Sequence, residues 1–330
     1  MPDLSTQYMG LKLRNPIIVS SCDLTKSVTG IKKCEDAGAG AVVLKSIFEE
    51  QFLIKGEIPE SGHYIHPEAL DYLRTGGLLE YGPQKICQTI EEAKKEVDIP
   101  LIASINCQTP KLWPSFAKQI YDAGADGLEL NIYFLPLKLD EPGSSYEQNY
   151  IDILNGIKDQ VPIPISVKLT SQITSIPYLA QRLGDAGADA LVLFNWFLAP
   201  DIDVNNRTTR TIKGKGNLFE SLKWVALLAD RVSCDISSSG GVNNSDDIVK
   251  FILAGSSAVQ ACSVFYEKGL GEIELLLKGI QDWMKTNRFN SLDEFRGELS
   301  FYKQQLIFKD LGEAEMYFRA QYLKTYSKFA

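Results

Sequence analysis

Histidine is nearly absent from this sequence, and its scarcity excludes several kinds of active site. The 330 residues include two histidines, His63 and His66. A metal centre built on three histidines is therefore impossible, and a Ser-His-Asp hydrolase is not expected. Catalysis must instead use lysine, asparagine, serine, tyrosine, acidic side chains or a bound cofactor.

Cysteine is sparse and scattered. The chain contains no C-x-x-C pair, so neither a zinc site nor an iron–sulfur cluster is predicted, and we expect no bound metal. In a large chain without secretory features, such cysteines are expected to be free thiols. The six are Cys22, Cys34, Cys87, Cys107, Cys234 and Cys262.

The sequence also lacks long apolar runs, a basic apolar leader and excess positive charge. No stretch approaches the ~20 apolar residues of a membrane span, and the first ten residues do not resemble a signal peptide. The net charge is −8, while 45% of residues are hydrophobic and 23% are charged. We therefore expect a folded cytoplasmic protein that binds neither membranes nor nucleic acid.

A repeated pattern indicates alternating helices and strands. A helix-like segment ends in Ala-Gly and runs into an apolar, β-rich segment four times, at 35–46, 121–131, 184–195 and 252–263. Each glycine is expected to end its helix in a left-handed conformation. The apolar run that follows is typical of a strand buried on both faces.

The remaining apolar segments bring the number of predicted strands to eight. Strict alternation of strands with amphipathic helices predicts a (β/α)8 TIM barrel, with an open doubly wound sheet as the alternative. Residues 1–300 would form the barrel and 301–330 a helical extension, which either packs on the barrel or contacts another subunit. The predicted strands are 15–21, 40–46, 100–106, 127–131, 164–169, 190–195, 234–240 and 258–263, and the helices include 83–97, 110–123, 146–160, 175–186, 217–231 and 244–254.

Two long connections, residues 47–82 and 196–216, follow predicted strands. Active sites of such barrels lie at the carboxyl ends of the strands, so both loops are expected over the barrel mouth. Lys45 and Lys168 end two apolar strands there. A buried lysine needs an anionic partner, so the pair favours an anionic ligand over two side chains that reach solvent or pair with nearby acids.

The segment 237–247, SSSGGVNNSDD, predicts a strand, a glycine turn and a helix start. Gly240 and Gly241 would let backbone N–H groups approach a phosphate, and Ser263 ends the next strand. Loops after the seventh and eighth strands commonly bind phosphate in TIM barrels. A plain turn is the alternative at Gly240-Gly241.

The order of these motifs resembles the dihydroorotate dehydrogenases, especially the class 1 FMN proteins. The resemblance covers residues 4–300, and the later SLDEFRGELS (291–300) looks like the end of that family's barrel. The matching segments are NPIIVSSCDLT, GAGAVVLKSI, GADGLELN, PISVKL, the strand ending at Asn195, and SSSGGVNNSDDIVKFILAGSSAVQACSVFYEKG.

The resemblance implies a barrel with FMN in its mouth. Lys168 would stabilise the negative charge of reduced flavin, and Lys45, Asn131 and Asn195 would contact substrate. A small electron acceptor and a homodimer are also implied. The residues implied to bind FMN are Ser20, Ser21, Lys45, Ser46, Asn106, Asn131, Lys168, Gly240, Gly241, Cys262 and Ser263.

The chain departs from the family at the catalytic loop. The family places a cysteine or serine base after Asn-x-Ser, whereas this chain reads Asn131-Ile-Tyr-Phe-Leu-Pro136. The base position falls on Phe134 or Leu135, neither of which accepts a proton, and the neighbouring Tyr133 is a weak base near pKa ~10. A base relocated to Cys107 or Cys22 is the alternative.

Three functions follow from these observations. The first is an FMN-dependent oxidoreductase that resembles dihydroorotate dehydrogenase of pyrimidine biosynthesis but turns over dihydroorotate weakly or uses another substrate. The second is a flavin-binding protein impaired in catalysis. The third is a flavin-free barrel that performs lyase or isomerase chemistry on a phosphorylated metabolite, with Lys45 or Lys168 as its amine.

Overall fold

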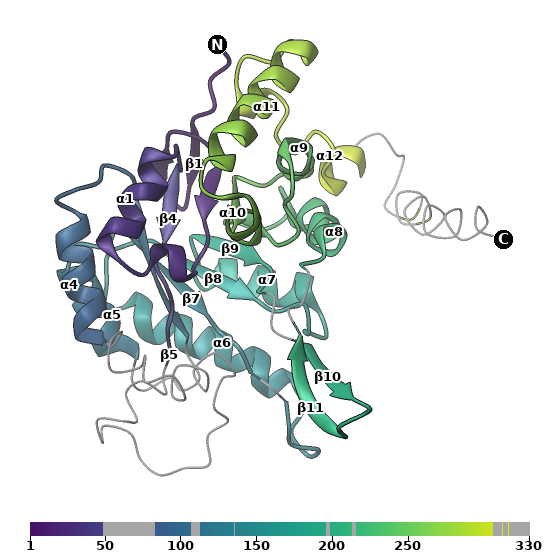
Figure 1. Ribbon diagram of the computed structural model, residues 1–330. Helices are drawn as coiled ribbons and strands as arrows, with labels where there is room; N and C mark the ends of the chain where they lie inside the picture. The colour runs from purple at the N-terminus through teal and green to yellow at the C-terminus, as the bar shows by residue number, and fades with distance from the viewer. Residues whose placement is uncertain are drawn as a thin grey trace.

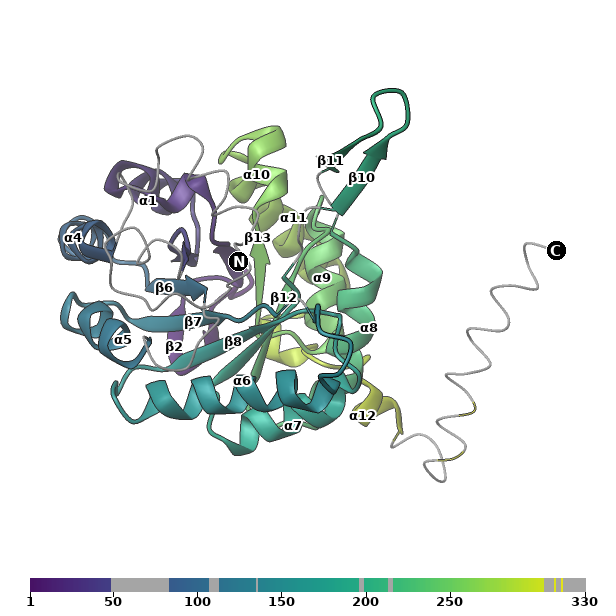
Figure 2. The ribbon, with the colours of Figure 1, turned by 90° about the horizontal axis from the view of Figure 1, so that it is seen from below.

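A closed ring of parallel strands forms the centre of the molecule (Figures 1 and 2). The computed structural model describes residues 1–48, 83–106, 113–134, 136–195, 199–212 and 216–305, with residues 312 and 316. The sheet closes because β13 pairs with β3 and β4 pairs with β6. The predicted TIM barrel is thus confirmed and the open sheet is wrong. In chain order its strands are β3 (Ile17–Val19), β4 (Ala41–Val43), β6 (Leu101–Asn106), β7 (Gly127–Asn131), β8 (Ile165–Leu169), β9 (Ala190–Leu193), β12 (Asp235–Ser239) and β13 (Ala258–Ala261).

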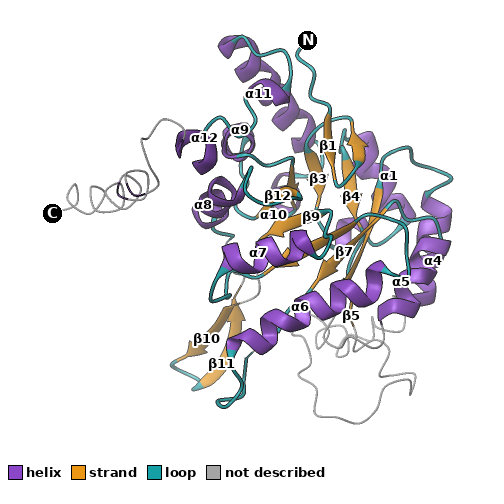
Figure 3. Cartoon of the chain, turned by 180° about the vertical axis from the view of Figure 1, so that it is seen from behind, coloured by secondary structure: helices purple, strands orange, loops and turns teal. Residues whose placement is uncertain are grey.

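Helices surround the ring, as Figure 3 shows from behind. The glycines that end the four Ala-Gly repeats have positive φ, +102° at Gly38, +95° at Gly124, +89° at Gly187 and +119° at Gly255. This confirms the predicted left-handed helix ends. The helices are α1 (Val28–Asp36), α4 (Pro83–Ala93), α5 (Trp113–Asp122), α6 (Gly143–Lys158), α7 (Ile176–Asp185), α8 (Leu218–Leu228) and α9 (Ser245–Ala254).

The strands bury two chemically different faces. Residues such as Val42, Leu128 and Val167 belong to the large apolar core that includes the helices. Between them in sequence lie Glu129, Ser166 and Lys168, which are buried polar residues. Since side chains alternate across a strand, this second set faces the inside of the barrel.

An N-terminal hairpin closes the end of the barrel opposite the mouth. It consists of β1 (Thr6–Tyr8) and β2 (Leu11–Leu13), joined by a turn in which Met9 and Gly10 both have positive φ. Tyr8 and Met9 pack on inward-facing residues of the strands, including Ile18, Ala41 and Ile102. The repeating pattern of the sequence did not predict this apolar plug, which leaves the opposite end of the barrel as the place for a ligand.

Of the two long connections, the second differs from the prediction. Ile47–Phe48 forms β5, which pairs with β6, and residues 49–82 lie outside the described residues. The second connection was expected to be a loop but contains an antiparallel hairpin, β10 (Ala199–Asp203) and β11 (Thr208–Ile212). Threonine and isoleucine favour strands, and Asp203 accepts hydrogen bonds from the backbone of Asn205 and Asn206 in the turn. The hairpin projects away from the barrel in Figures 1 and 2.

After β13 the chain forms α10 (Ser263–Lys268), α11 (Glu272–Asn287), the short η2 (Leu292–Glu294) and α12 (Phe301–Gln305). The rings of Trp283, Phe289 and Phe295 pack against one another and hold the segment that contains η2 against α11. Most of the predicted extension beyond residue 305 lies outside the described residues. Within the described part of the chain, no helix is both long and apolar enough to span a bilayer.

Candidate active site at the barrel mouth

The carboxyl ends of the strands bring most of the predicted site residues to one end of the barrel. Asn106 and Asn131 are the last residues of β6 and β7, and Lys168 lies one residue before the end of β8. Ser20, Lys45 and Asn195 follow β3, β4 and β9 by one or two residues. Parallel strands in a ring place all these positions around one opening.

Lys168 lies inside this opening within a buried polar cluster. Its side chain is 6% exposed, and its ammonium is 3.4 Å from the carboxylate of Glu129, which is fully buried. The same ammonium is 3.2 Å from Oε1 of Gln260 and 3.4 Å from Oγ of Ser20. These distances exceed the ~2.7–2.9 Å typical of a strong charged hydrogen bond, so the ammonium is loosely held, with its three N–H groups shared among three acceptors.

Gln260 and Glu129 support that cluster. Gln260 donates from Nε2 to Oε2 of Glu129 at 2.6 Å, and Ser20 Oγ lies 3.1 Å from Oε1 of Gln260. Glu129 and Gln260 are not among the site residues predicted from the sequence. A charged residue within the apolar strand GLELN and an amide within AVQA were the available signals, since such groups are rarely buried without a partner.

A chain of serine hydroxyls runs beside this cluster. Ser21 and Ser46 lie 2.9 Å apart through their Oγ atoms, and Ser46 and Ser104 lie 2.7 Å apart. Ser46 also donates its backbone N–H to Ser21 at 2.9 Å. These bonds tie the ends of β3, β4 and β6 together and fix the position of the neighbouring Lys45, whose ammonium is 3.7 Å from Asp23.

Asn106 differs from these serines because its buried amide has no partner among the described residues. The residue is fully buried, and neither Oδ1 nor Nδ2 makes a hydrogen bond. Leaving both ends of an amide unsatisfied costs about 1–3 kcal/mol per group. A buried and unsatisfied amide at the mouth of a barrel points to a ligand that supplies the missing donor and acceptor.

Asn131 and Asn195, the two amides predicted to bind substrate, are brought together. The Nδ2 group of Asn195 donates to Oδ1 of Asn131 across the end of β8. The backbone N–H of Asn195 also donates to Leu169 at 2.8 Å, which holds the loop after β9 against that strand. Each side chain keeps polar atoms for a further partner, since an amide has two donors and two lone pairs.

Gly240 and Gly241 form the predicted turn after β12. Their φ angles are +91° and +79°, which only glycine adopts freely. A Cβ atom on Gly241 would lie 2.6 Å from the backbone nitrogen of Leu218, so this turn requires glycine for close backbone packing. Cys262 and Ser263 follow the adjacent strand β13 and begin α10. The structure thus brings these four residues to neighbouring strand ends.

Phe134, one of the two residues at which the base position is predicted, has an aromatic environment. Phe134 packs edge-on against Tyr150 at 5.7 Å between ring centres and against Tyr146 at 6.1 Å. Tyr150 donates to the carbonyl of Ile132 at 3.0 Å, and burial raises its pKa above the usual range. Tyr133 is 9% exposed, while Leu135 and Cys107 lie outside the described residues. Asn131, Ile132 and Phe134 carry no acid–base group, and Tyr133 stays a predicted weak candidate.

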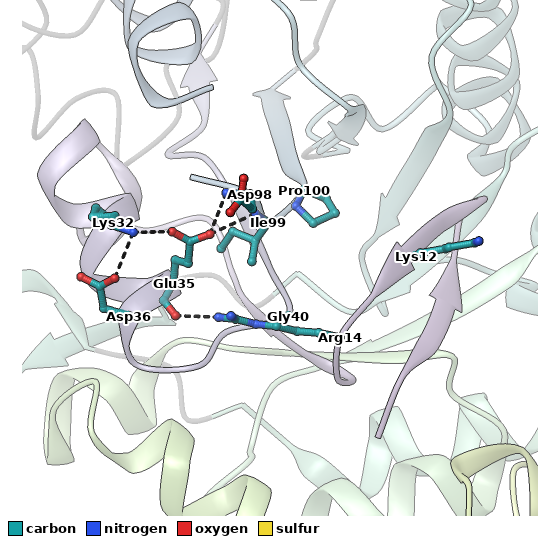
Figure 4. Close-up of a pocket in the computed structure, with 9 residues that line it drawn as sticks. All are labelled: Lys12, Arg14, Lys32, Glu35, Asp36, Gly40, Asp98, Ile99 and Pro100. Atoms are coloured by element: carbon teal, nitrogen blue, oxygen red, sulfur yellow. Dashed lines mark hydrogen bonds and ion pairs between the residues drawn. The ribbon is translucent and has the colours of Figure 1, made fainter. Parts of the chain in front are cut away.

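A hollow lies near the opposite end of the barrel, and the polar groups of its Glu35 and Arg14 are occupied (Figure 4). Glu35 accepts hydrogen bonds from the backbone of Asp98 at 2.7 Å and of Ile99 at 3.2 Å, and from Lys32 at 2.8 Å. Arg14 donates to the carbonyls of Ala39 and Glu35 at 2.9 and 2.6 Å. These bonds fasten α1 to the segment before β6, so this hollow is a structural junction.

Comparison with known proteins identifies the family. The dihydroorotate dehydrogenase family model matches residues 3–284. A protein of Methanothermobacter thermautotrophicus named dihydroorotate dehydrogenase B (NAD(+)), catalytic subunit, is 29% identical over 313 residues, covering 89% of this chain and 97% of that protein. Proteins with the same name from Methanosarcina mazei and Pyrococcus abyssi are 30% and 28% identical, covering 87% and 89% of this chain and 92% and 98% of theirs. The chain therefore belongs to the dihydroorotate dehydrogenase family of oxidoreductases.

Proposed function

We propose that this protein is an FMN-dependent oxidoreductase that acts on a carbon–carbon bond next to a carbonyl group, and that it turns over dihydroorotate slowly or acts on a different substrate. The polar barrel mouth supports the first part of the proposal. The aromatic side chain at the base position supports the second.

The buried amide of Asn106 is the observation that carries flavin binding. Its two unsatisfied ends match a ligand with both donors and acceptors, as a flavin ring has. The loosely held ammonium of Lys168 adds positive charge nearby, and the glycine turn at Gly240-Gly241 offers backbone N–H groups beside Cys262 and Ser263. The residues present at the mouth therefore fit FMN.

In this proposal the residues have separate tasks. FMN, when bound, supplies hydride transfer. Lys168 would hold positive charge beside the cofactor, with Glu129 and Gln260 keeping the ammonium in place. Ser20, Ser21, Ser46 and Asn106 would hold the ring, and Gly240, Gly241, Cys262 and Ser263 the phosphate. Lys45, Asn131 and Asn195 would orient the substrate.

The missing base limits the chemistry. Removal of a proton by a positioned base contributes about 10²–10⁴ in rate. Phe134 is held among tyrosine rings and offers no such group, so dihydroorotate is expected to be a poor substrate. The same observation favours a second candidate function, a flavin-binding protein with impaired catalysis.

The names of the relatives bear on the electron acceptor. They are named as catalytic subunits of an NAD(+) enzyme, so we propose that this chain works with a second protein subunit through which electrons leave. The small electron acceptor and the homodimer that the sequence implied stay predictions. Purification of the protein from its native source, followed by mass spectrometry of co-purifying chains, tests the subunit proposal.

Flavin absorbance and anaerobic reduction test the proposed function. The purified protein is expected to show flavin absorbance, or to gain it when FMN is added, and to bleach slowly with dihydroorotate under anaerobic conditions. Absence of flavin after FMN is added would overturn the proposal and favour the flavin-free barrel. Bleaching as fast as in an enzyme with its cysteine base would remove the claim of an altered substrate.

Variants at the base position sharpen this test. Either Phe134→Cys or Leu135→Cys is expected to accelerate bleaching by dihydroorotate at least about tenfold, because it restores a thiol base. Phe134→Leu is the matched control, since it removes the same ring without adding a base. If no cysteine variant exceeds Phe134→Leu, the substrate itself differs from dihydroorotate.

A further inference from the structure

Two cysteines lie side by side at the barrel mouth, on the loops that follow neighbouring strands. Cys22 comes after β3, directly before the short helix η1 (Asp23–Thr25), and Cys262 comes after β13, directly before α10. The strands pair in parallel, with Ala261 opposite Val19. The backbone N–H of Ser20 also donates to Ala261 at 2.9 Å, so the pairing extends to the edge of both loops.

Two hydrogen bonds between the loops bracket the two cysteines, from the backbone N–H of Ser20 to Ala261 on one side and from the backbone N–H of Asp23 to the Tyr266 hydroxyl on the other. Cys22 is 5% exposed and lies at the edge of the apolar core, and Cys262 is half-buried and packs against the same core. The hydroxyl of Tyr266 in α10 accepts the bond from the backbone N–H of Asp23 at 2.9 Å, which links the two loops a second time. Lys45 and Lys168 both act on the pair electrostatically.

Of the two thiols, that of Cys22 loses its proton more readily. The hydrogen bond from Cys262 lowers the pKa of Cys22 to about 7 against the opposing effect of burial, with help from the backbone of Leu24, from Tyr266 and from Lys45. The same hydrogen bond and burial raise the pKa of Cys262. Burial raises the pKa of Cys34 and of Cys234 to about 12. Among the cysteines in the described ranges, Cys22 is thus the one available as a thiolate near neutral pH.

We propose that Cys22 and Cys262 form a redox-active dithiol, a site of reversible oxidative modification that reacts with small hydroperoxides. The Cys22 thiolate attacks one oxygen of hydrogen peroxide, the O–O bond breaks, and a sulfenic acid and hydroxide form. Cys262 then attacks the Cys22 sulfur, the S–O bond breaks, and the disulfide and a second hydroxide form. The protons of the two thiols convert the two hydroxides to water, so the sulfurs lose two electrons and the peroxide gains them.

Closing this disulfide would tie the loop after β3 to the start of α10. Both sulfurs lie on loops, so they can approach the ~2.05 Å of an S–S bond without breaking the barrel ladder. Cys262 directly precedes Ser263, and oxidation is therefore expected to weaken phosphate binding there. This last consequence rests on the proposed function, whereas the dithiol itself does not.

Peptide mapping tests the dithiol on the full-length purified protein with whatever flavin it carries. The protein is treated with hydrogen peroxide, blocked with iodoacetamide and mapped by mass spectrometry before and after reduction with dithiothreitol. We expect a reducible cross-link between the peptides that contain Cys22 and Cys262. Alkylation of Cys22 in the untreated protein should rise with pH through a midpoint near 7 and be at least about 100-fold faster at neutral pH than that of Cys34.

Single-cysteine variants separate the two roles. Cys262→Ser should leave a sulfenic acid on Cys22 that dimedone traps, Cys22→Ser should form neither species, and Cys34→Ser should behave as the parent. If both cysteines of the parent remain open to alkylation after peroxide, or if the cross-link joins other cysteines, the proposal is overturned. Flavin content is recorded separately: a protein without flavin that still forms the disulfide counts against the proposed function and supports the dithiol.

Discussion

Glu35 and Arg14 at the closed end of this barrel differ from Lys168 and Asn106 at its mouth in how well their polar groups are satisfied. At the closed end, Glu35 and Arg14 make short hydrogen bonds of 2.6–3.2 Å to backbone groups. At the mouth, the ammonium of Lys168 lies 3.2–3.4 Å from its acceptors, and Asn106 has no hydrogen-bond partner among the described residues. Glu35 and Arg14 thus hold the fold together at the closed end, where the buried hydroxyls of Tyr8 and Ser256 make no hydrogen bond, whereas Asn106 at the mouth leaves a whole amide for a ligand.

The difference shows how to separate structural from functional polarity in one molecule. Both ends carry charged and hydrogen-bonding residues, so composition does not distinguish them. The distinguishing property is how fully each buried group is satisfied by the chain itself. Variants at the two ends should therefore divide into those that change the free energy of unfolding and those that change ligand binding.

The largest effect on stability is expected at Lys168, where a change should alter both the free energy of unfolding and ligand binding. Lys168→Met leaves the carboxylate of Glu129 buried without a cation and should lower the free energy of unfolding by about 3–5 kcal/mol. The double variant Lys168→Met/Glu129→Gln should recover much of that loss but not flavin binding. Urea unfolding and flavin titration measure the two effects.

Lys118→Met is the control for this experiment. Its ion pair with Asp122 is exposed, at 59% and 54%, so its loss should change stability by less than about 1 kcal/mol. Equal losses of unfolding free energy in Lys168→Met and Lys118→Met would show that the buried pair Lys168–Glu129 stabilises the fold no more than an exposed pair does.

A smaller effect is expected at the closed end. Glu35→Ala leaves the backbone N–H groups of Asp98 and Ile99 without their acceptor and should cost about 1–3 kcal/mol of unfolding free energy. Glu35→Gln retains one acceptor oxygen and should cost less. Flavin affinity should be unchanged in both, and a loss of affinity would contradict the division between the two ends.

The contribution of Glu35 to the free energy of unfolding should also depend on pH. Burial alone would raise the pKa of this carboxyl, but hydrogen bonds from Lys32 and from the backbone of Asp98 and Ile99 lower it overall. A lowered folded-state pKa gives stability that is present above the unfolded pKa, ~4.3, and is lost as pH falls through the folded value. The stability gap between the parent and Glu35→Gln should thus hold at pH 7 and narrow below about pH 4, as denaturant titrations would show.

The smallest effect on stability, and a clear one on binding, is expected at Asn106. Asn106→Leu removes a buried amide that makes no hydrogen bond within the described chain, so the unfolding free energy without ligand should stay nearly constant or rise. Affinity for FMN should fall by about 10-fold or more, because the ligand loses both hydrogen bonds. Ser221→Ala is the matched control, since its hydroxyl donates to Ser239 at 2.8 Å and its loss should cost stability.

Much of the fold could be predicted from local patterns. Each predicted barrel strand exists, and the four Ala-Gly repeats end helices as expected, because the chemistry of a glycine helix end acts over a few neighbouring residues. Both antiparallel hairpins were missed. Their signals, Met9-Gly10 and the Asp203 turn, are short and lie in segments that break the repeating pattern.

The site was predictable as a set of positions but not as a set of contacts. Lys168, Asn131 and Ser20 follow from the rule that strand ends line the mouth. That Lys168 faces Glu129 and Gln260, or that Cys22 lies beside Cys262, depends on which strands become neighbours when the sheet closes.

Local patterns in the chain therefore predict the alternation of strands and helices, the residues at each strand end and the apolar pair Phe134-Leu135 at the expected base position. Closure of the barrel sets which buried polar groups satisfy one another and which are left for a ligand. The physical reason is range: backbone periodicity and turn chemistry act over a few residues, whereas Lys168 and Gln260 meet across 92 positions of the chain only after the ring of strands has closed.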